Sequence, residues 1–384
     1  MSDQICTEES LGMDATARMF VAIELSGVSW VIAVHAPHAD KISCHHLKSG
    51  AGAALVDLID VLRKRAEMTL GVPVVALSCY EAGFDGFWLH RYLIAAGIQN
   101  HVIDPASIQV SRRVRRAKTD GIDVEALLRA LMAWHRGEKR VCAIVRVPTP
   151  EAEDARRISR EREALMKERI RHVNRITGLL ATQGIRDYEP LRARRHERLD
   201  TLHTGDNRPL PLKLKAEIGR SLKRLELVME MLREIETVRD EVAAESVRTN
   251  GSIGQLMMLR GVGPEIATVL QGEAFNRQFD NRREIAAYAG LTPSPWSSGT
   301  LQREQGISKA GNSRLRRTMV ELAWLWLRYQ PESHLSAWFR DRVRDGKGRI
   351  RRVAIVALAR KLLVALWRYV DTGLIPEGSL MKAQ

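Results

Sequence analysis

Four acidic residues in the first third of the chain have the types and spacing of a metal site. Glu24 lies late in an apolar strand-like run, and Glu81 follows another such run. Asp120 and Asp123 are three residues apart at the start of a predicted helix, so they share one face. A carboxylate inside an apolar strand is costly unless a cation or hydrogen bonds compensate it. Carboxylate oxygens are the ligands that Mg²⁺ prefers, and two such ions about 4 Å apart can hold both oxygens of a phosphate displacement.

Each of these carboxylates, taken alone, also has a structural explanation. Asp120 and Asp123 would stabilise a helix N-terminus through the helix dipole. Glu81 could be a solvent-facing residue at a strand end, and Glu24 an exposed residue of an edge strand. Their combination favours a two-metal magnesium site for phosphate chemistry.

A basic run directly precedes Asp120. It reads Ser-Arg-Arg-Val-Arg-Arg-Ala-Lys over residues 111–118. Beside a metal site, such charges would neutralise the phosphates of a nucleic-acid backbone, whereas the alternative is a solvated loop. The predicted backbone contacts are Arg112, Arg113, Arg115, Arg116 and Lys118.

A second group of candidate residues lies in the last third of the chain. Ser297 and Ser298 precede Gly299 in a segment bounded by proline and glycine, predicted to be a loop that presents a hydroxyl. No His–Asp pair lies nearby, so this segment lacks the residues of a serine hydrolase. The alternative to a nucleophilic role is that these are ordinary loop serines. Polar and basic residues that could donate to phosphate follow this loop, namely Lys309, Asn312, Arg314, Arg316 and Arg317.

The segment 256–270 looks like a helix-hairpin-helix. Gly261 and Gly263 flank a valine in a turn where the backbone could approach a phosphate closely. A helix is predicted to start at Pro264 and to direct its N–H groups at the anion. This pattern indicates binding to a DNA backbone without sequence readout, and the alternative is a purely structural tight turn.

Residues 19–147 alternate strand and helix patterns, which predicts an α/β domain. Three antiparallel strands come first, followed by alternating helices and strands, and this order matches an RNase H-like arrangement. A Rossmann domain is excluded because the first strand is followed by neither a crossover helix nor a glycine fingerprint. The predicted strands are 20–25, 30–35, 41–47, 72–78 and 99–103, and the predicted helices are 53–66, 84–96 and 120–135.

The rest of the chain is predicted to be all-α. Residues 1–18 are a polar, disordered tail, and 148–250 form a helical hairpin or coiled-coil stalk, because apolar residues recur every three or four positions from Leu222 to Val242. The alternative for this stalk is two solvated helices packed on a domain. Residues 251–384 form a third, mostly helical domain.

The charge balance points to a polyanionic partner. The 384 residues carry a formal net charge of +14, which makes nucleic acid the first candidate. No apolar run approaches the ~18–20 residues that span a bilayer, and the N-terminus does not resemble a signal peptide. We therefore expect a cytoplasmic protein with no membrane partner.

Together these segments resemble the DEDD insertion-sequence transposases, the group that includes the Piv-type DNA invertases. The resemblance runs from about Phe20 to Asp371, and its most specific motifs are Lys-Thr-Asp-Gly-Ile-Asp at 118–123 and Ser-Gly at 298–299 followed by Gly-Ile-Ser-Lys-Ala-Gly-Asn at 306–312. Glu24 departs from the group, which usually has the shorter aspartate there. The other matching segments are 21–26, 80–83 and 259–264.

The resemblance implies a RuvC-like N-terminal domain that binds Mg²⁺ through Glu24, Glu81, Asp120 and Asp123. It implies that Ser298, or alternatively Ser297, attacks DNA and becomes covalently linked to it. It further implies a homo-oligomer, dimer or tetramer, and a noncoding guide RNA that pairs with donor and target DNA.

Two other functions fit the same residues. The first is a RuvC-like nuclease or junction resolvase that cuts DNA with metal ions but performs no strand transfer, for which the serine loop would be dispensable. The second is a non-catalytic, nucleic-acid-binding remnant of a transposase, which would tolerate changes at Asp120.

Overall fold

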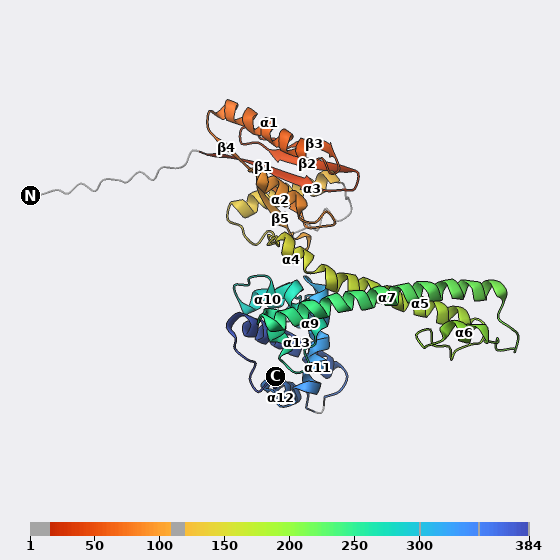
Figure 1. The fold of residues 1–384 in the computed structure, drawn as a ribbon. Coiled ribbons are helices and arrows are strands. Elements are labelled where there is room, and N and C mark those ends of the chain that lie inside the picture. The colour runs from red at the N-terminus through yellow and green to blue at the C-terminus, as the bar shows by residue number, and fades with distance from the viewer. Residues whose placement is uncertain (1–15, 109–119, 299–300, 345, 383–384) are drawn as a thin grey trace, which may run out of the picture. The chain divides into compact units, whose positions relative to one another are not determined.

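The computed structural model describes residues 16–108, 120–298, 301–344 and 346–382, and it divides into two compact units, Met1–Val147 and Pro148–Gln384 (Figure 1). The basic run at 111–118 lies outside the described residues, as does most of the predicted tail. The first strand already begins at Ala17.

A five-stranded mixed sheet forms the centre of the first unit. Its order is β3-β2-β1-β4-β5, with β1, β2 and β3 antiparallel and β1, β4 and β5 parallel. All five predicted strands are confirmed, although Glu81 is the last residue of β4 and does not lie past its end. The strands are β1 (Ala17–Glu24), β2 (Ser29–His35), β3 (Ser43–Lys48), β4 (Val74–Glu81) and β5 (Gln99–Ile103).

Helices cover both faces of this sheet. Alternate strand residues such as Val21 and Ile23 pack in one core with α1 (Gly52–Leu70) and α2 (Trp88–Ala95). The residues between them, Ala22 among them, pack in a second core with α3 (Asp120–His135). The first unit is therefore a three-layer α/β/α domain, and a short turn of 3₁₀ helix, η1 (Pro105–Ser107), follows β5.

Two long antiparallel helices dominate the beginning of the second unit (Figure 1). Their direction follows from two ion pairs, since Arg175 contacts Glu217 and Arg162 contacts Glu236. Apolar residues between them form a narrow core. This part comprises α4 (Pro150–Asp154), α5 (Arg157–Ala181), α6 (Arg195–Asp200) and α7 (Leu212–Arg248).

The remainder of the second unit is helical around one large core that includes Leu322, Trp326 and Leu358. A β-hairpin of β6 (Pro293–Ser298) and β7 (Leu301–Ile307) interrupts these helices. The helices are α8 (Ser252–Met257), α9 (Pro264–Leu270), the π-helical turn η2 (Gln271–Phe275), α10 (Arg282–Tyr288), α11 (Ser313–Tyr329), α12 (His334–Val343) and α13 (Arg349–Thr372).

The hairpin corrects one prediction. Ser297 and Ser298 were expected in a loop, but they are the last two residues of β6 and pair with Gln302 and Leu301. Prolines at 293 and 295 disguised the strand, and its pairing partner lies beyond the turn. Among the described residues, none of the helices is both long enough and apolar enough to cross a bilayer.

Candidate functional site

Glu24 and Glu81 end two neighbouring parallel strands. Ile23 is in register with Tyr80, so the two carboxylates lie at the same edge of the sheet. Ala22 and Cys79, two residues before them, are in the core against α3. Because strand residues alternate between faces, Glu24 and Glu81 lie on the face that α3 covers.

The direction of α3 is fixed by contacts at its end and its middle. The His135 ring at its C-terminus lies 5.4 Å from the ring of Phe20, which precedes the level of Cys79 by two residues along the sheet. In the middle of the helix, the carbonyl of Leu127 accepts a weak hydrogen bond from the Cys79 thiol at 3.9 Å. The helix therefore runs opposite to β1, and its N-terminus lies toward the strand ends that carry the two glutamates.

These contacts place Asp123 level with Glu81. Asp123 precedes Leu127 by four residues, about 6 Å along a helix, and Glu81 follows Cys79 by two residues, about 7 Å along a strand. Burial raises the pKa of the Cys79 thiol, and nearby Cys142 and the Glu81 carboxylate raise it further. The Glu81 carboxylate therefore lies near the Cys79 side chain, on the face of the sheet that α3 covers.

The structure thus places Glu24 and Glu81 at neighbouring strand ends, and it places Asp123 in the first turn of the helix that covers the same face of the sheet. Asp120 is the first residue of α3, but its side chain lies outside the described part of the chain. Among the described residues, no three His, Cys, Asp or Glu side chains are grouped closely enough to hold a metal ion. The donors are all carboxylate oxygens, and this chemistry fits Mg²⁺, while the four-carboxylate site itself stays a prediction.

In the second unit, two glycines allow the segments on either side of the β6–β7 hairpin to approach each other closely. Gly290 and Gly311 have φ of +65° and +87°. A Cβ at Gly290 would come within 2.1 Å of the Ala310 carbonyl oxygen, and one at Gly311 within 2.3 Å of the Tyr288 carbonyl oxygen. Only glycine fits such close approaches, so the segments on either side of the hairpin are held together.

The arginines predicted to bind phosphate already have protein partners. Arg314 contacts Glu163 at 2.6 Å and Glu273 at 3.5 Å, and it donates to the carbonyl of Ser159 at 2.7 Å. Arg317 contacts the other oxygen of Glu163 at 2.7 Å. These contacts tie the start of α11 to α5, so a phosphate contact by either arginine stays a prediction.

Asn312 and Arg316 are also engaged within the protein. Asn312 caps α11 by accepting from Leu315 N at 3.0 Å and donates to Glu273 at 2.8 Å. Arg316 donates to the carbonyl of Ala289 at 3.2 Å and to that of Lys309 at 3.0 Å. Lys309 itself is exposed.

Sequence reasoning missed Glu273, the acid at the centre of this cluster. It lies in η2, its side chain is 1% exposed, and Arg160 binds both of its carboxylate oxygens at 3.0 and 3.2 Å. Burial alone would raise the pKa of Glu273, but hydrogen bonds from Arg160 and Asn312 and the charges of Arg160 and Arg314 lower it. The only sequence signal is an acid within a mostly apolar helical segment.

The predicted helix-hairpin-helix turn is packed against the C-terminal segment. α9 begins at Pro264 as predicted, and Gly261 has φ of +88°, where an added Cβ would lie 3.1 Å from Tyr329 Cβ. Lys382 donates to the carbonyl of Val262 at 2.9 Å. Glu265 in the first turn of α9 forms ion pairs with Arg239 at 3.1 Å and Arg162 at 3.4 Å, which tie this turn to α7 and α5. The turn therefore has a structural role, and its binding to DNA stays a prediction.

Glu163 couples the stability of the second unit to pH. Burial alone would raise the pKa of Glu163, but hydrogen bonds from Lys167 and Arg317 and the charges of Arg314 and Arg317 lower it to about 2. Because this value lies below the ordinary 4.5, the stabilisation is complete above about pH 4.5 and is lost as the pH falls toward 2.

Glu163→Gln is therefore expected to lower the free energy of unfolding at pH 7 by on the order of 2 kcal/mol, with a smaller loss at pH 3. Thermal unfolding followed by circular dichroism at both pH values measures this difference. Glu161→Gln, at an exposed position of the same helix, is the control and should change little. An equal loss at both pH values would contradict the assigned ion pairs.

Comparison with known proteins decides the family. The model of the IS116/IS110/IS902 transposase family matches residues 254–337. A Sinorhizobium fredii protein named as transposase y4rJ is 51% identical over 374 residues. The match covers 95% of this chain and 94% of that protein. The chain belongs to the IS116/IS110/IS902 transposase family.

More distantly related transposases match over most of the chain. The transposase for insertion sequence element IS1111A of Coxiella burnetii is 27% identical, and the match covers 79% of this chain and 80% of that protein. The transposase for IS1328 of Yersinia enterocolitica is 26% identical, with 79% and 85% covered. The segment matched by the family model contains Glu273 and the β6–β7 hairpin, whereas the three carboxylates lie outside it.

Proposed function

We propose that this insertion-sequence transposase cuts and rejoins DNA with a magnesium-binding carboxylate edge and a serine nucleophile. The proposal is supported by Glu24 and Glu81 ending adjacent parallel strands, and by Asp123 lying in the first turn of α3, the helix that covers the same face of the sheet. Membership of a transposase family makes DNA the substrate.

The carboxylate edge supplies oxygen ligands and negative charge. Glu24, Glu81 and Asp123 come from three different elements, and Asp120 begins the same helix as Asp123. Glu24 is one methylene longer than aspartate, so its oxygens reach further from the strand. Bound Mg²⁺ would polarise a phosphate oxygen and stabilise the charge that develops on it.

Ser298 is the proposed nucleophile, and Ser297 is its alternative. The serine oxygen forms a phosphoester with DNA as the bond between phosphorus and a sugar oxygen breaks, and the hydroxyl proton passes to the released sugar oxygen. A second sugar hydroxyl reverses this exchange and frees the serine. Because one ester replaces another, rejoining needs no external energy.

A guide RNA and a homo-oligomer are part of the proposal through the family resemblance. The net charge of +14 favours binding of any nucleic acid, RNA included. Four apolar residues of α7 are spaced four, seven and four positions apart, and each is at least 40% exposed. They are Leu227, Met231, Val238 and Val242. Such an apolar stripe on one helix face is typical of a coiled-coil partner surface, which supports a dimer or tetramer.

A nuclease without strand transfer is the second candidate. It is favoured by the engagement of Asn312, Arg314, Arg316 and Arg317 within the protein, because the hairpin then has fewer phosphate donors than predicted. In that case water, and not a serine, would attack the phosphate at the carboxylate edge.

A mobilisation assay separates the two candidates. A plasmid carrying this gene with its natural flanking DNA is introduced into cells with a second, target plasmid, and junctions are amplified and sequenced. The proposal expects joined element–target junctions that are absent when the gene is deleted from the plasmid. Broken DNA without such junctions would support the nuclease.

A further inference from the structure

Positive charge is concentrated where α12 ends and α13 begins, in the second unit (Figure 1). Residues 340–352 contain six arginines and one lysine against two aspartates, a net charge of +5 in 13 residues. The whole chain of 384 residues has a net charge of +14. The exposed cations of this segment form a surface named here the basic corner, which consists of Arg342, Arg344, Lys347, Arg349, Arg351 and Arg352.

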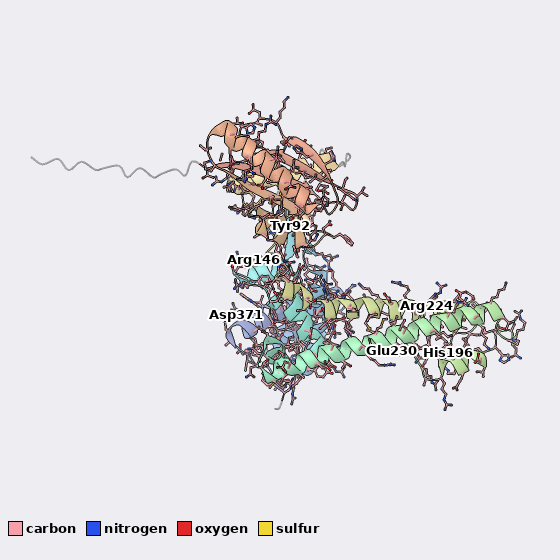
Figure 2. The ribbon with its side chains drawn as sticks, turned by 45° about the horizontal axis from the view of Figure 1, so that its top comes forward. Tyr92, Arg146, His196, Arg224, Glu230 and Asp371 are labelled. Carbon is pink, nitrogen blue, oxygen red and sulfur yellow. The ribbon has the colours of Figure 1, made fainter. Side chains whose placement is uncertain are left out.

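Backbone hydrogen bonds hold the turn between the two helices. The N–H of Gly346 donates to the carbonyl of Val343 at 2.7 Å, and the N–H of Arg352 donates to the carbonyl of Gly348 at 3.2 Å. The basic side chains therefore come from the end of α12, the turn and the start of α13. The opposite end of α13 carries Asp371, which Figure 2 labels.

Most cations of the basic corner have no counter-charge in the protein. Arg344 contacts Asp341 at 3.5 Å, and both side chains of this pair are exposed. The other five are exposed as well, and none of them forms an ion pair with another residue in the part of the chain that the structure describes. Clustered cations of this kind produce a positive potential outside the surface, which attracts anions.

Three of these arginines lie in the first turn of α13, where they oppose the start of the helix. The helix dipole is positive at this end, and the turn contains no acidic residue. Arg349 and Arg352 are three residues apart, so they are neighbours on the helix surface and repel each other. The arginines therefore do not stabilise the free protein, and a bound anion would relieve their repulsion.

Arg351 is held in position by an aromatic ring of α11. Its guanidinium lies 5.1 Å from the centre of the Trp324 ring, and the Trp324 ring in turn lies 6.4 Å from the Phe339 ring. An arginine fixed in this way loses less side-chain freedom when it binds a ligand. The basic corner thus includes a preorganised donor as well as freely solvated cations.

A row of phosphates is the ligand that fits this surface. Guanidinium groups match phosphate oxygens with two parallel hydrogen bonds, and several cations spread over one surface match a polyanion better than a single small anion. We propose that the basic corner binds the phosphate backbone of duplex DNA and positions it without reading its sequence. The proposal rests on the proposed function in that it takes DNA as the substrate.

The salt dependence of DNA binding tests this proposal. The full chain is titrated with a fluorescein-labelled DNA duplex at several salt concentrations, and the affinity is measured by anisotropy. The double variant Arg349→Gln, Arg352→Gln should lower the slope of log affinity against log salt by about 1.8, which is roughly 0.9 for each lost phosphate contact. The loss should be the same for two duplexes of unrelated sequence.

A matched control removes the same charge elsewhere in the second unit. Arg233 and Arg248 are exposed on α7, where Arg248 contacts Glu245, and the double variant Arg233→Gln, Arg248→Gln should leave the slope nearly unchanged. Arg349→Lys, Arg352→Lys keeps both charges and should retain most of the slope. Without DNA, the Arg349→Gln, Arg352→Gln protein should melt at or above the wild-type temperature, because the repulsion in the first turn of α13 is gone.

Three results would overturn the proposal while the proposed function stands. The first is an unchanged slope in the folded Arg349→Gln, Arg352→Gln protein. The second is an equal loss in the α7 control, which would mean that only the net charge of the chain matters. The third is a loss that appears with an RNA duplex of the same sequence and not with DNA. If the wild type binds no DNA at any salt concentration, the proposed function fails and this inference falls with it.

Discussion

Asp123→Ala is expected to abolish magnesium-dependent cleavage of DNA, with a rate loss of at least roughly a hundredfold, while the protein stays folded. Asp123 lies half-buried in the first turn of α3, level with Glu81. Its removal leaves Glu24 and Glu81 without the ligand that the helix supplies. Asp120→Ala should have the same effect, because both aspartates begin that helix.

The control for this prediction is Glu125→Gln, two residues further along α3. Glu125 forms an exposed ion pair with Arg129 one turn on, at 3.4 Å. Cleavage of end-labelled DNA is measured against magnesium concentration, and thermal unfolding is measured without metal. The metal-free Asp123→Ala protein should melt at or above the wild-type temperature, since one of several like charges has gone. Full magnesium-dependent cleavage by Asp123→Ala would show that Asp123 is not a metal ligand.

Ser298→Ala is expected to eliminate strand joining, whereas Ser297→Ala should retain part of it. The two serines are neighbours at the end of β6, and Ser298 is the one followed directly by glycine, as in the resembling family. Joining is measured by sequencing junctions between plasmids, and retained DNA binding by Ser298→Ala shows that only the chemistry is lost. Normal joining by Ser298→Ala, with or without loss in Ser297→Ala, would exclude Ser298 as the nucleophile.

The strands of the first unit could be predicted because their signals are local. The predicted bounds of β5, Gln99–Ile103, match the observed ones, and the predicted end of β1 at residue 25 is one residue beyond the observed end at Glu24, whereas β4 extends three residues beyond its predicted end at residue 78. An acid at the end of an apolar strand is visible in sequence, and the parallel pairing of β1 with β4 brings the two strand ends together.

The two long helices of the second unit and the start of α9 at Pro264 were predicted, but the partners of its polar side chains were not, because these contacts join residues distant in sequence. Arg160 and Glu273 are 113 residues apart, and Arg314 donates to a carbonyl 155 residues away. The type of a residue shows that an arginine can bind an anion, but it does not show whether that anion is a phosphate or a buried glutamate. The β6 strand was hidden for a related reason, since its partner follows the turn and prolines lie within it.

The fate of the DNA end after cutting distinguishes a serine nucleophile from attack by water. Wild-type protein is incubated with Mg²⁺ and labelled DNA carrying the flanks of this gene, then denatured and separated on a gel. Attack by Ser298 predicts a slowly migrating protein–DNA adduct, sensitive to protease, with the DNA attached to the peptide that contains Ser298. Cut DNA with only free ends, and no adduct at any time point, would contradict the serine mechanism and leave a metal-dependent nuclease.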